Sequence, residues 1–206
     1  MVQGPLAAAT IGPSSRWFGP FEHARLLAAI HARQTVLPAR YGMELPDEEA
    51  VRAFLSNRSE NLLSDLDRVE GANEIGLRIE LDCNPVTKPP ASSDSAGSDV
   101  SPARYLALRL ARYQRQDRAS AQAQLAVANL LRALEGLYRS WRQLLPEAFG
   151  TVRLAFLVDR QRSEAFVNRL ESWKSDQPAR RCTVLGPWPP YSFVGVATTS
   201  RSFPPL

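Results

Sequence analysis

Lysine and histidine are scarce in this chain of 206 residues, and both scarcities restrict its chemistry. Only two lysines occur, Lys88 and Lys174, so the net charge of +4 comes from arginine. The two histidines, His23 and His31, lie on one expected helix with no cysteine nearby. Because metal ligation needs more donors than these, we expect surface or partly packed histidines and no bound metal.

Cysteines and long apolar runs are also rare. Cys83 and Cys182 lie far apart with no CxxC spacing, which is typical of free thiols in a reducing compartment. No apolar run approaches the ~20 residues that span a bilayer. The first residues also lack the basic region of a signal peptide. We therefore expect a cytoplasmic protein with no membrane partner.

Sequence motifs of enzymes are absent too. The chain contains no GxSxG, Walker A, GxGxxG or HExxH motif. The acidic runs at 47–49 and 65–67 fall at expected helix caps and on solvated faces, where the helix dipole or solvent explains them. The sequence therefore predicts no catalytic residue and no cofactor. A pI near 9.4 leaves open a nucleic-acid or regulatory binding module.

The first part of the chain alternates strand and helix patterns. The expected elements are a strand at 6–11, a helix at 20–33, an extended edge segment at 35–45, a helix at 47–71 and a strand at 75–81. Pro38 lacks an N–H group, which favours an edge position for its segment. Asp47 and Gly71 are typical first and last caps of the helix between them.

A stretch rich in proline and small polar residues, 84–102, predicts a linker or a disordered loop. The elements expected after it are a helix at 103–145, a strand at 151–160, a helix capped by Ser163, and strands at 181–186 and 191–197. The long helix is expected because apolar residues recur every three or four positions: Val127, Leu131, Leu134, Tyr138, Trp141 and Leu145. Helices alternating with short, half-polar strands favour an α+β fold of the ferredoxin-like kind, with helices on one side of the sheet.

Two stretches place prolines beside aromatic residues next to expected strands: VLPARYG at 36–42 and GPWPPYSF at 186–193. Proline stiffens a loop, and a stiff loop can either fill a corner of the core or present an exposed contact surface. The residues leave both interpretations open.

The same stretches carry a family resemblance. VLGPWPPYSFV at 184–194 resembles the signature near the C-terminus of gas vesicle synthesis proteins of the L/F family. VLPARYGMELPDEEAVRAFL at 36–55 resembles the VLPxRFG-type segment of that family, and LVDR at 157–160 resembles its strand before the last helix. The resemblance covers most of residues 5–197 outside the linker.

The resemblance implies a non-enzymatic, gas vesicle-associated accessory protein of the cytoplasm. Its expected partners are the hydrophobic shell subunit and other gas vesicle accessory proteins, with a chaperone- or nucleation-like role and no nucleic acid. The implied domains are a ferredoxin-like α+β domain at 1–82, a linker at 83–102, and an α+β domain with the long helix at 103–206. Because GPLAAATI at 4–11 resembles a later strand of the family, the first domain is expected to lack its opening strand.

The resemblance also selects the residues expected to bind the partner. They are Leu37, Pro38, Arg40, Tyr41, Trp188, Pro189, Pro190, Tyr191 and Phe193. Arg40 is the expected polar anchor of this set. The sequence does not decide which members face a partner and which hold the fold.

Overall fold

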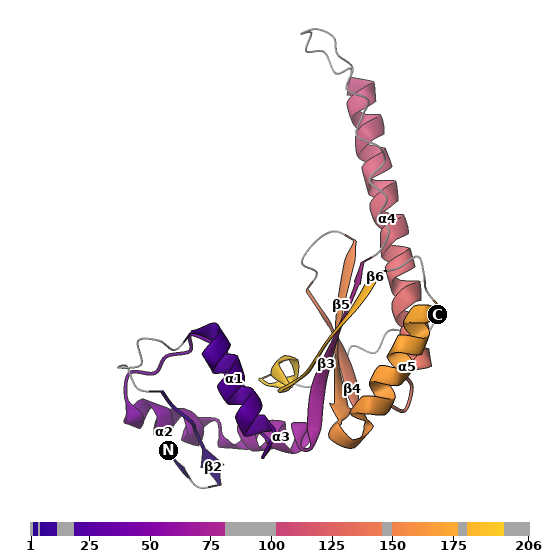
Figure 1. The fold of residues 1–206 in the computed structure, drawn as a ribbon. Helices are drawn as coiled ribbons and strands as arrows, with labels where there is room; N and C mark the ends of the chain where they lie inside the picture. The colour runs from indigo at the N-terminus through magenta and orange to yellow at the C-terminus, as the bar shows by residue number, and fades with distance from the viewer. Residues whose placement is uncertain are drawn as a thin grey trace.

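The computed structural model describes residues 2–3, 5–11, 19–80, 102–145, 150–176 and 181–195. Its elements, shown in Figure 1, are β1 (Val2–Gln3), β2 (Leu6–Ala7), α1 (Pro20–His31), α2 (Glu48–Asn57), α3 (Ser59–Val69), β3 (Ala72–Glu80), α4 (Pro102–Ala133), β4 (Ser140–Leu144), β5 (Thr151–Asp159), η1 (Arg160–Arg162), α5 (Ser163–Ser175), β6 (Arg181–Trp188) and η2 (Tyr191–Phe193). The mixture of helices and an antiparallel sheet confirms the α+β class.

The main sheet has the strand order β4-β5-β3-β6, and every neighbouring pair is antiparallel. β3 and β5 pair along their whole length, from Ala72 opposite Asp159 to Glu80 opposite Thr151. Along the chain, β3, α4, β4, β5, α5 and β6 follow the β-α-β-β-α-β order of the ferredoxin-like fold. That topology is therefore present between residues 72 and 188.

This location corrects the expectation that residues 1–82 contain the ferredoxin-like sheet. The strand expected at 75–81 exists as β3, but it pairs with β5 and β6, which both follow residue 102. The alternation of Ile75, Leu77 and Ile79 predicts which face of a strand is buried, but it does not identify the neighbouring strand. The division of the chain into two domains otherwise stays a prediction, and the expected linker lies almost entirely outside the described residues.

Helices α4 and α5 cover one face of the sheet (Figure 1). Buried side chains between them form the main core: Ile75, Leu77 and Ile79 of β3, Val152, Leu154, Phe156 and Val158 of β5, Val127 and Leu130 of α4 with Leu134 just after it, and Phe166, Leu170 and Trp173 of α5. The Phe156 ring lies 5.4 Å from that of Tyr138 and 5.2 Å from that of Phe166. The opposite face of β3 presents Glu74, Gly76 and Arg78.

The N-terminal elements pack around α2 and α3. Asp47 caps α2 as expected, because its carboxylate accepts a hydrogen bond of 2.8 Å from the Ala50 N–H. Leu6 of β2 and the α2 residues Val51 and Leu55 form a small cluster of their own. The helix expected to run unbroken to residue 71 is interrupted at Arg58, so that α2 and α3 are separate helices.

Three further expectations about the elements are wrong. The long helix ends at Ala133, and the residues at 140–144 form β4 instead. Residues 35–45 contain no strand, and residues 191–193 form the short helix η2. Val2 of β1 lies opposite Ala7 of β2 in a short two-stranded sheet, and the expected absence of the family's opening strand stays a prediction.

Within the part of the chain that the structure describes, no helix is long and apolar enough to cross a membrane.

Candidate functional site

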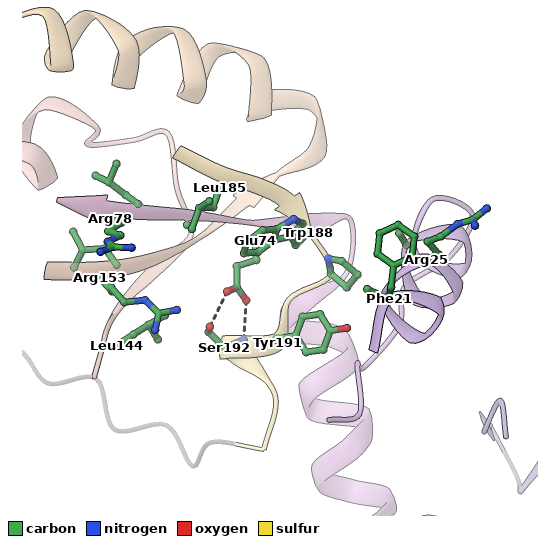
Figure 2. A pocket seen from close by; sticks show the side chains of 16 residues that line it. Phe21, Arg25, Glu74, Arg78, Leu144, Arg153, Leu185, Trp188, Tyr191 and Ser192 are labelled. Atoms are coloured by element: carbon green, nitrogen blue, oxygen red, sulfur yellow. Dashed lines mark hydrogen bonds between the residues drawn. The ribbon is translucent and has the colours of Figure 1, made fainter. Parts of the chain in front are cut away.

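A cavity of about 570 Å³ lies on the sheet face opposite α4 and α5. Its floor comes from the strands, one wall comes from α1, and the other comes from the segment after β6. The lining residues are Phe21, Ala24, Arg25 and Ala28 of α1, Glu74, Gly76, Leu77 and Arg78 of β3, Leu144, Arg153 and Leu154 of β4 and β5, and Leu185, Trp188, Pro189, Tyr191 and Ser192. We call this cavity the sheet pocket. Figure 2 shows Phe21 and Arg25 on one side and Arg78 and Arg153 on the other.

Glu74 holds the wall after β6 in place. The Ser192 N–H donates to Oε2 of Glu74 and the Ser192 hydroxyl donates to Oε1, both at 2.7 Å (Figure 2). Glu74 is only 5% exposed, and burial raises its pKa, although the two bonds from Ser192 act in the opposite direction. The bonds therefore fix residues 191–193 against the centre of the sheet.

A second set of polar contacts holds the end of this segment. The Gly195 N–H donates to the Asp65 carboxylate at 2.7 Å, and Arg68 pairs with Asp65 while donating to the Phe193 carbonyl. Asp65 is buried, which corrects the expectation that the acidic run at 65–67 lies on a solvated face. Residues 192–195 are thus bonded to both β3 and α3.

The wall on α1 is fixed by a chain of hydrogen bonds through His31. Arg160 donates to the imidazole Nδ1 at 3.2 Å, so the proton of the neutral ring lies on Nε2, which donates to the Asn73 side-chain oxygen at 2.9 Å. Asn73 in turn donates to the Ser163 hydroxyl at 3.1 Å. Burial lowers the pKa of His31, and the Arg160 charge adds to that effect against the Asn73 bond. His31 is therefore a packed, neutral residue that joins α1 to the sheet.

The nine residues expected to bind a partner divide between core and surface. Pro38, Pro189, Pro190 and Phe193 are buried, and Leu37 is half-buried. Leu37 packs against the cluster that contains Phe193, so the two sequence stretches meet inside the protein. These five side chains are thus wholly or partly packed inside the protein, although Pro189 also lines the sheet pocket.

The other four expected residues are exposed, but they are not all in one place. Trp188, which is 45% exposed, and Tyr191 both line the sheet pocket. Tyr41 instead lies beside His23 of α1, with ring centres 5.7 Å apart. Neither Tyr41 nor the exposed Arg40 is among the lining residues. The structure therefore brings the exposed aromatics of the second stretch to the pocket and leaves those of the first outside it.

Several pocket residues were not expected from the sequence. Glu74 precedes the strand expected at 75–81, so it was not assigned to that strand's polar face. Phe21 is an aromatic residue near the start of the helix expected at 20–33, and it is exposed at the pocket wall. Arg153 occupies a polar position in a clearly alternating strand, and that alternation was the one signal available for it.

The pocket offers a surface for binding. Its walls are largely aromatic and aliphatic, while Arg25, Arg78 and Arg153 supply positive charge around the buried Glu74. Among the residues that the structure describes, no group of three or more His, Cys, Asp or Glu side chains could hold a metal ion. What the geometry provides is a pre-formed, mostly apolar recess with a basic margin.

The pocket and both sequence stretches lie inside a region matched by one family model. Residues 20–195 match the model of the gas vesicle synthesis protein GvpL/GvpF. The chain belongs to the GvpL/GvpF family. The match ends at Gly195, the residue bonded to Asp65 at the end of the pocket wall.

Relatives in this family include both of its named kinds. The chain is 27% identical over 183 residues to gas vesicle protein L of Streptomyces sp. (strain CB03234), covering 85% of this chain and 68% of that protein. It is 28% identical over 207 residues to gas vesicle protein F of the same organism, covering 94% of this chain and 86% of that protein.

The fold is shared with solved structures of the GvpL/GvpF family. The crystal structure of GvpF from Anabaena sp. PCC7120 matches with a TM-score of 0.68 and 19% identity, covering 86% of this chain and 74% of that one. GvpF from Microcystis aeruginosa matches with a TM-score of 0.62 and 16% identity, covering 91% and 82%. At these identities the likeness establishes the fold.

Proposed function

We propose that this GvpL/GvpF family member is a non-enzymatic accessory protein of gas vesicle synthesis that binds the hydrophobic shell subunit through the sheet pocket. Family membership supports the process, and the pocket supports the mode of action. It also acts beside other accessory proteins, in the cytoplasm and at the growing vesicle.

One observation carries the proposal: among the residues that the structure describes, an apolar recess lies on the sheet face opposite α4 and α5. Bonds from Ser192 to Glu74 and from Gly195 to Asp65 fix its wall before any partner arrives. A fixed site loses little conformational freedom on binding, so more of the interaction free energy appears as affinity. Such a site can shield an apolar face of the shell subunit until that subunit is added to the vesicle.

The exposed aromatics give a direct test by co-purification. Trp188→Ala and Phe21→Ala each remove a large exposed side chain from the pocket lining, and we expect each to reduce recovery of the co-expressed shell subunit several-fold. Leu145→Ala is the matched control, because Leu145 is also exposed and apolar but does not line the pocket. Unchanged recovery with both pocket variants, at unchanged thermal stability, would show that the pocket is not the binding site.

A nucleic-acid or regulatory binding module remains the alternative prediction, resting on the basic pI. A gel-shift experiment with excess DNA and RNA separates the two functions. A salt-sensitive shift supports nucleic-acid binding, because arginine contacts to phosphate weaken as salt is added, and unchanged mobility excludes it.

A further inference from the structure

The N-terminal half of α4 carries a second surface, distinct from the sheet pocket. α4 has 32 residues, and at ~1.5 Å per residue it is about 48 Å long. The nine-residue strands of the sheet reach only about 30 Å. Figure 1 shows α4 extending past the strands. Its packing into the core begins around Ala123 and becomes complete at Ala126.

Residues 105–118, which we call the α4 overhang, expose large apolar side chains. Leu106, Leu110 and Tyr113 follow one another at spacings of four and three, so they form a stripe along one side of the helix. Leu106 is 61% exposed and Leu110 is 58% exposed. A helix without tertiary packing is marginally stable in water, so such a stripe is typical of a helix that packs against a partner.

The overhang is also the most basic part of the chain. Within residues 105–118 the sequence has four arginines and one aspartate, a formal charge of +3 against +4 for the whole protein. The described arginines of this stretch, Arg109 and Arg118, are exposed, and Arg109 lies over the ring of Tyr113. The surface therefore combines an apolar stripe with concentrated positive charge.

We propose that the α4 overhang docks an acidic amphipathic helix of a partner protein. Opposite charge on the partner complements the arginines, and its apolar face covers the stripe of Leu106, Leu110 and Tyr113. A second copy of this chain fits less well, because two overhangs would bring their positive charges together. A membrane surface also fits less well, because Tyr105 and Leu108 lie off the stripe and leave no purely polar side to face water.

The test uses the full chain and two synthetic helical peptides. One peptide has a leucine stripe with glutamate and alanine elsewhere, and the other has lysine in place of each glutamate. Fluorescence anisotropy measures their binding to the wild-type chain and to Leu106→Ala/Leu110→Ala. Alanine preserves the helix, since it has the highest helix propensity. Leu125→Ala is the matched control, because Leu125 is 65% exposed on the same helix outside the overhang.

We expect the glutamate peptide to bind at least about tenfold more tightly than the lysine peptide, and the double variant to lose about tenfold of that affinity. The affinity of Leu125→Ala for the glutamate peptide stays within about twofold of the wild-type affinity, and added salt weakens the complex. Equal binding of the two peptides, or unchanged binding by the double variant, overturns the proposal.

Three further outcomes also overturn it. A thermal midpoint of the double variant that drops as far as that of Leu130→Ala places the stripe inside the fold. Dimers of the wild-type chain that disappear in the double variant identify a second copy as the occupant. Overhang-dependent binding to phosphatidylserine vesicles, without binding of the glutamate peptide, identifies a membrane.

Discussion

Glu74 and His31 are buried, titratable residues that fix the two walls of the sheet pocket. Glu74 of β3 accepts hydrogen bonds from Ser192 of η2, and His31 of α1 donates one to Asn73 of β3. Each bond joins a surface segment to the same strand. Burial shifts the two pKa values in opposite directions, upward for the acid and downward for the imidazole. In both cases the neutral form becomes more favourable, so the two residues give opposite pH dependences of stability.

Replacement of Glu74 separates its hydrogen bonds from its charge. Glu74→Ala leaves the Ser192 donors unpaired beside the sheet, and we expect a loss of about 1–3 kcal/mol in the free energy of unfolding. Glu74→Gln keeps one acceptor and removes the buried charge, so its loss is smaller. Urea unfolding measures both variants.

The pH dependence of Glu74 supplies the check on that interpretation. Since the pKa is raised above 4.5, the folded chain binds a proton before the unfolded chain as the pH falls. The wild type therefore gains stability relative to Glu74→Gln on acidification from neutral pH toward 4.5. If the difference in the free energy of unfolding between the wild type and Glu74→Gln stays constant across that range, the carboxylate of Glu74 is not buried as described.

His31 gives the opposite prediction. Its pKa is lowered from 6.5, so the unfolded chain binds the proton first and the contribution of His31 to stability is lost as the pH falls below 6.5. We expect His31→Gln, which can keep the bonds to Asn73 and Arg160, to remove this part of the fall. His23→Gln is the matched control and retains it. Denaturant midpoints at about pH 8 and about pH 5 measure the effect. The same change in midpoint between the two pH values for the wild type and for His31→Gln would refute it.

At the scale of elements, β6 depends on Gly186. This glycine has φ +106°, and a Cβ there would lie 2.7 Å from the Glu74 carbonyl oxygen of the central strand β3. We expect Gly186→Ala to displace the end of β6 and to lower the free energy of unfolding by clearly more than the ~1–2 kcal/mol of backbone strain alone. Thermal or urea unfolding measures the loss.

Gly136→Ala is the matched control for that prediction. Gly136 also has positive φ, at +78°, but nothing lies within 4 Å of an added Cβ. Its variant carries the backbone strain without the collision. Equal losses for the two variants would show that the contact with Glu74 does not matter.

The elements show how far the local pattern is informative. Asp47 and Gly71 were correct signals, because caps and turns depend on neighbouring residues only. The long helix was extended too far because Tyr138 and Trp141 continue the spacing of a helical stripe. Both side chains do pack against the main core, which α4 shares with the sheet. Tyr138, however, lies in the segment after α4, and Trp141 lies in β4. Gly136, which has a positive φ, follows shortly after the helix end, and a glycine at such a place is typical of a helix C-terminus.

At the scale of the whole molecule, the fold class follows from the sequence but the strand partners do not. β3 and β5 are hydrogen-bonded neighbours across a long separation in the chain, and alternation in each strand reveals only its buried face. The same limit applies to the site. Trp188 and Tyr191 were expected, whereas Phe21, Arg25 and Arg153 come to the pocket only through the packing of α1 and the pairing of the sheet.

The central claim is that the sheet pocket binds the gas vesicle shell subunit. Hydrogen exchange of the full chain, measured with and without the purified shell subunit, tests it most directly, because binding slows exchange where the partner covers or steadies the backbone. The account predicts slower exchange at 20–28 of α1 and at 185–195, with little change on α5, which lies on the opposite face of the sheet. Slower exchange on α5 with none at those two segments, or no change anywhere despite a formed complex, would contradict it.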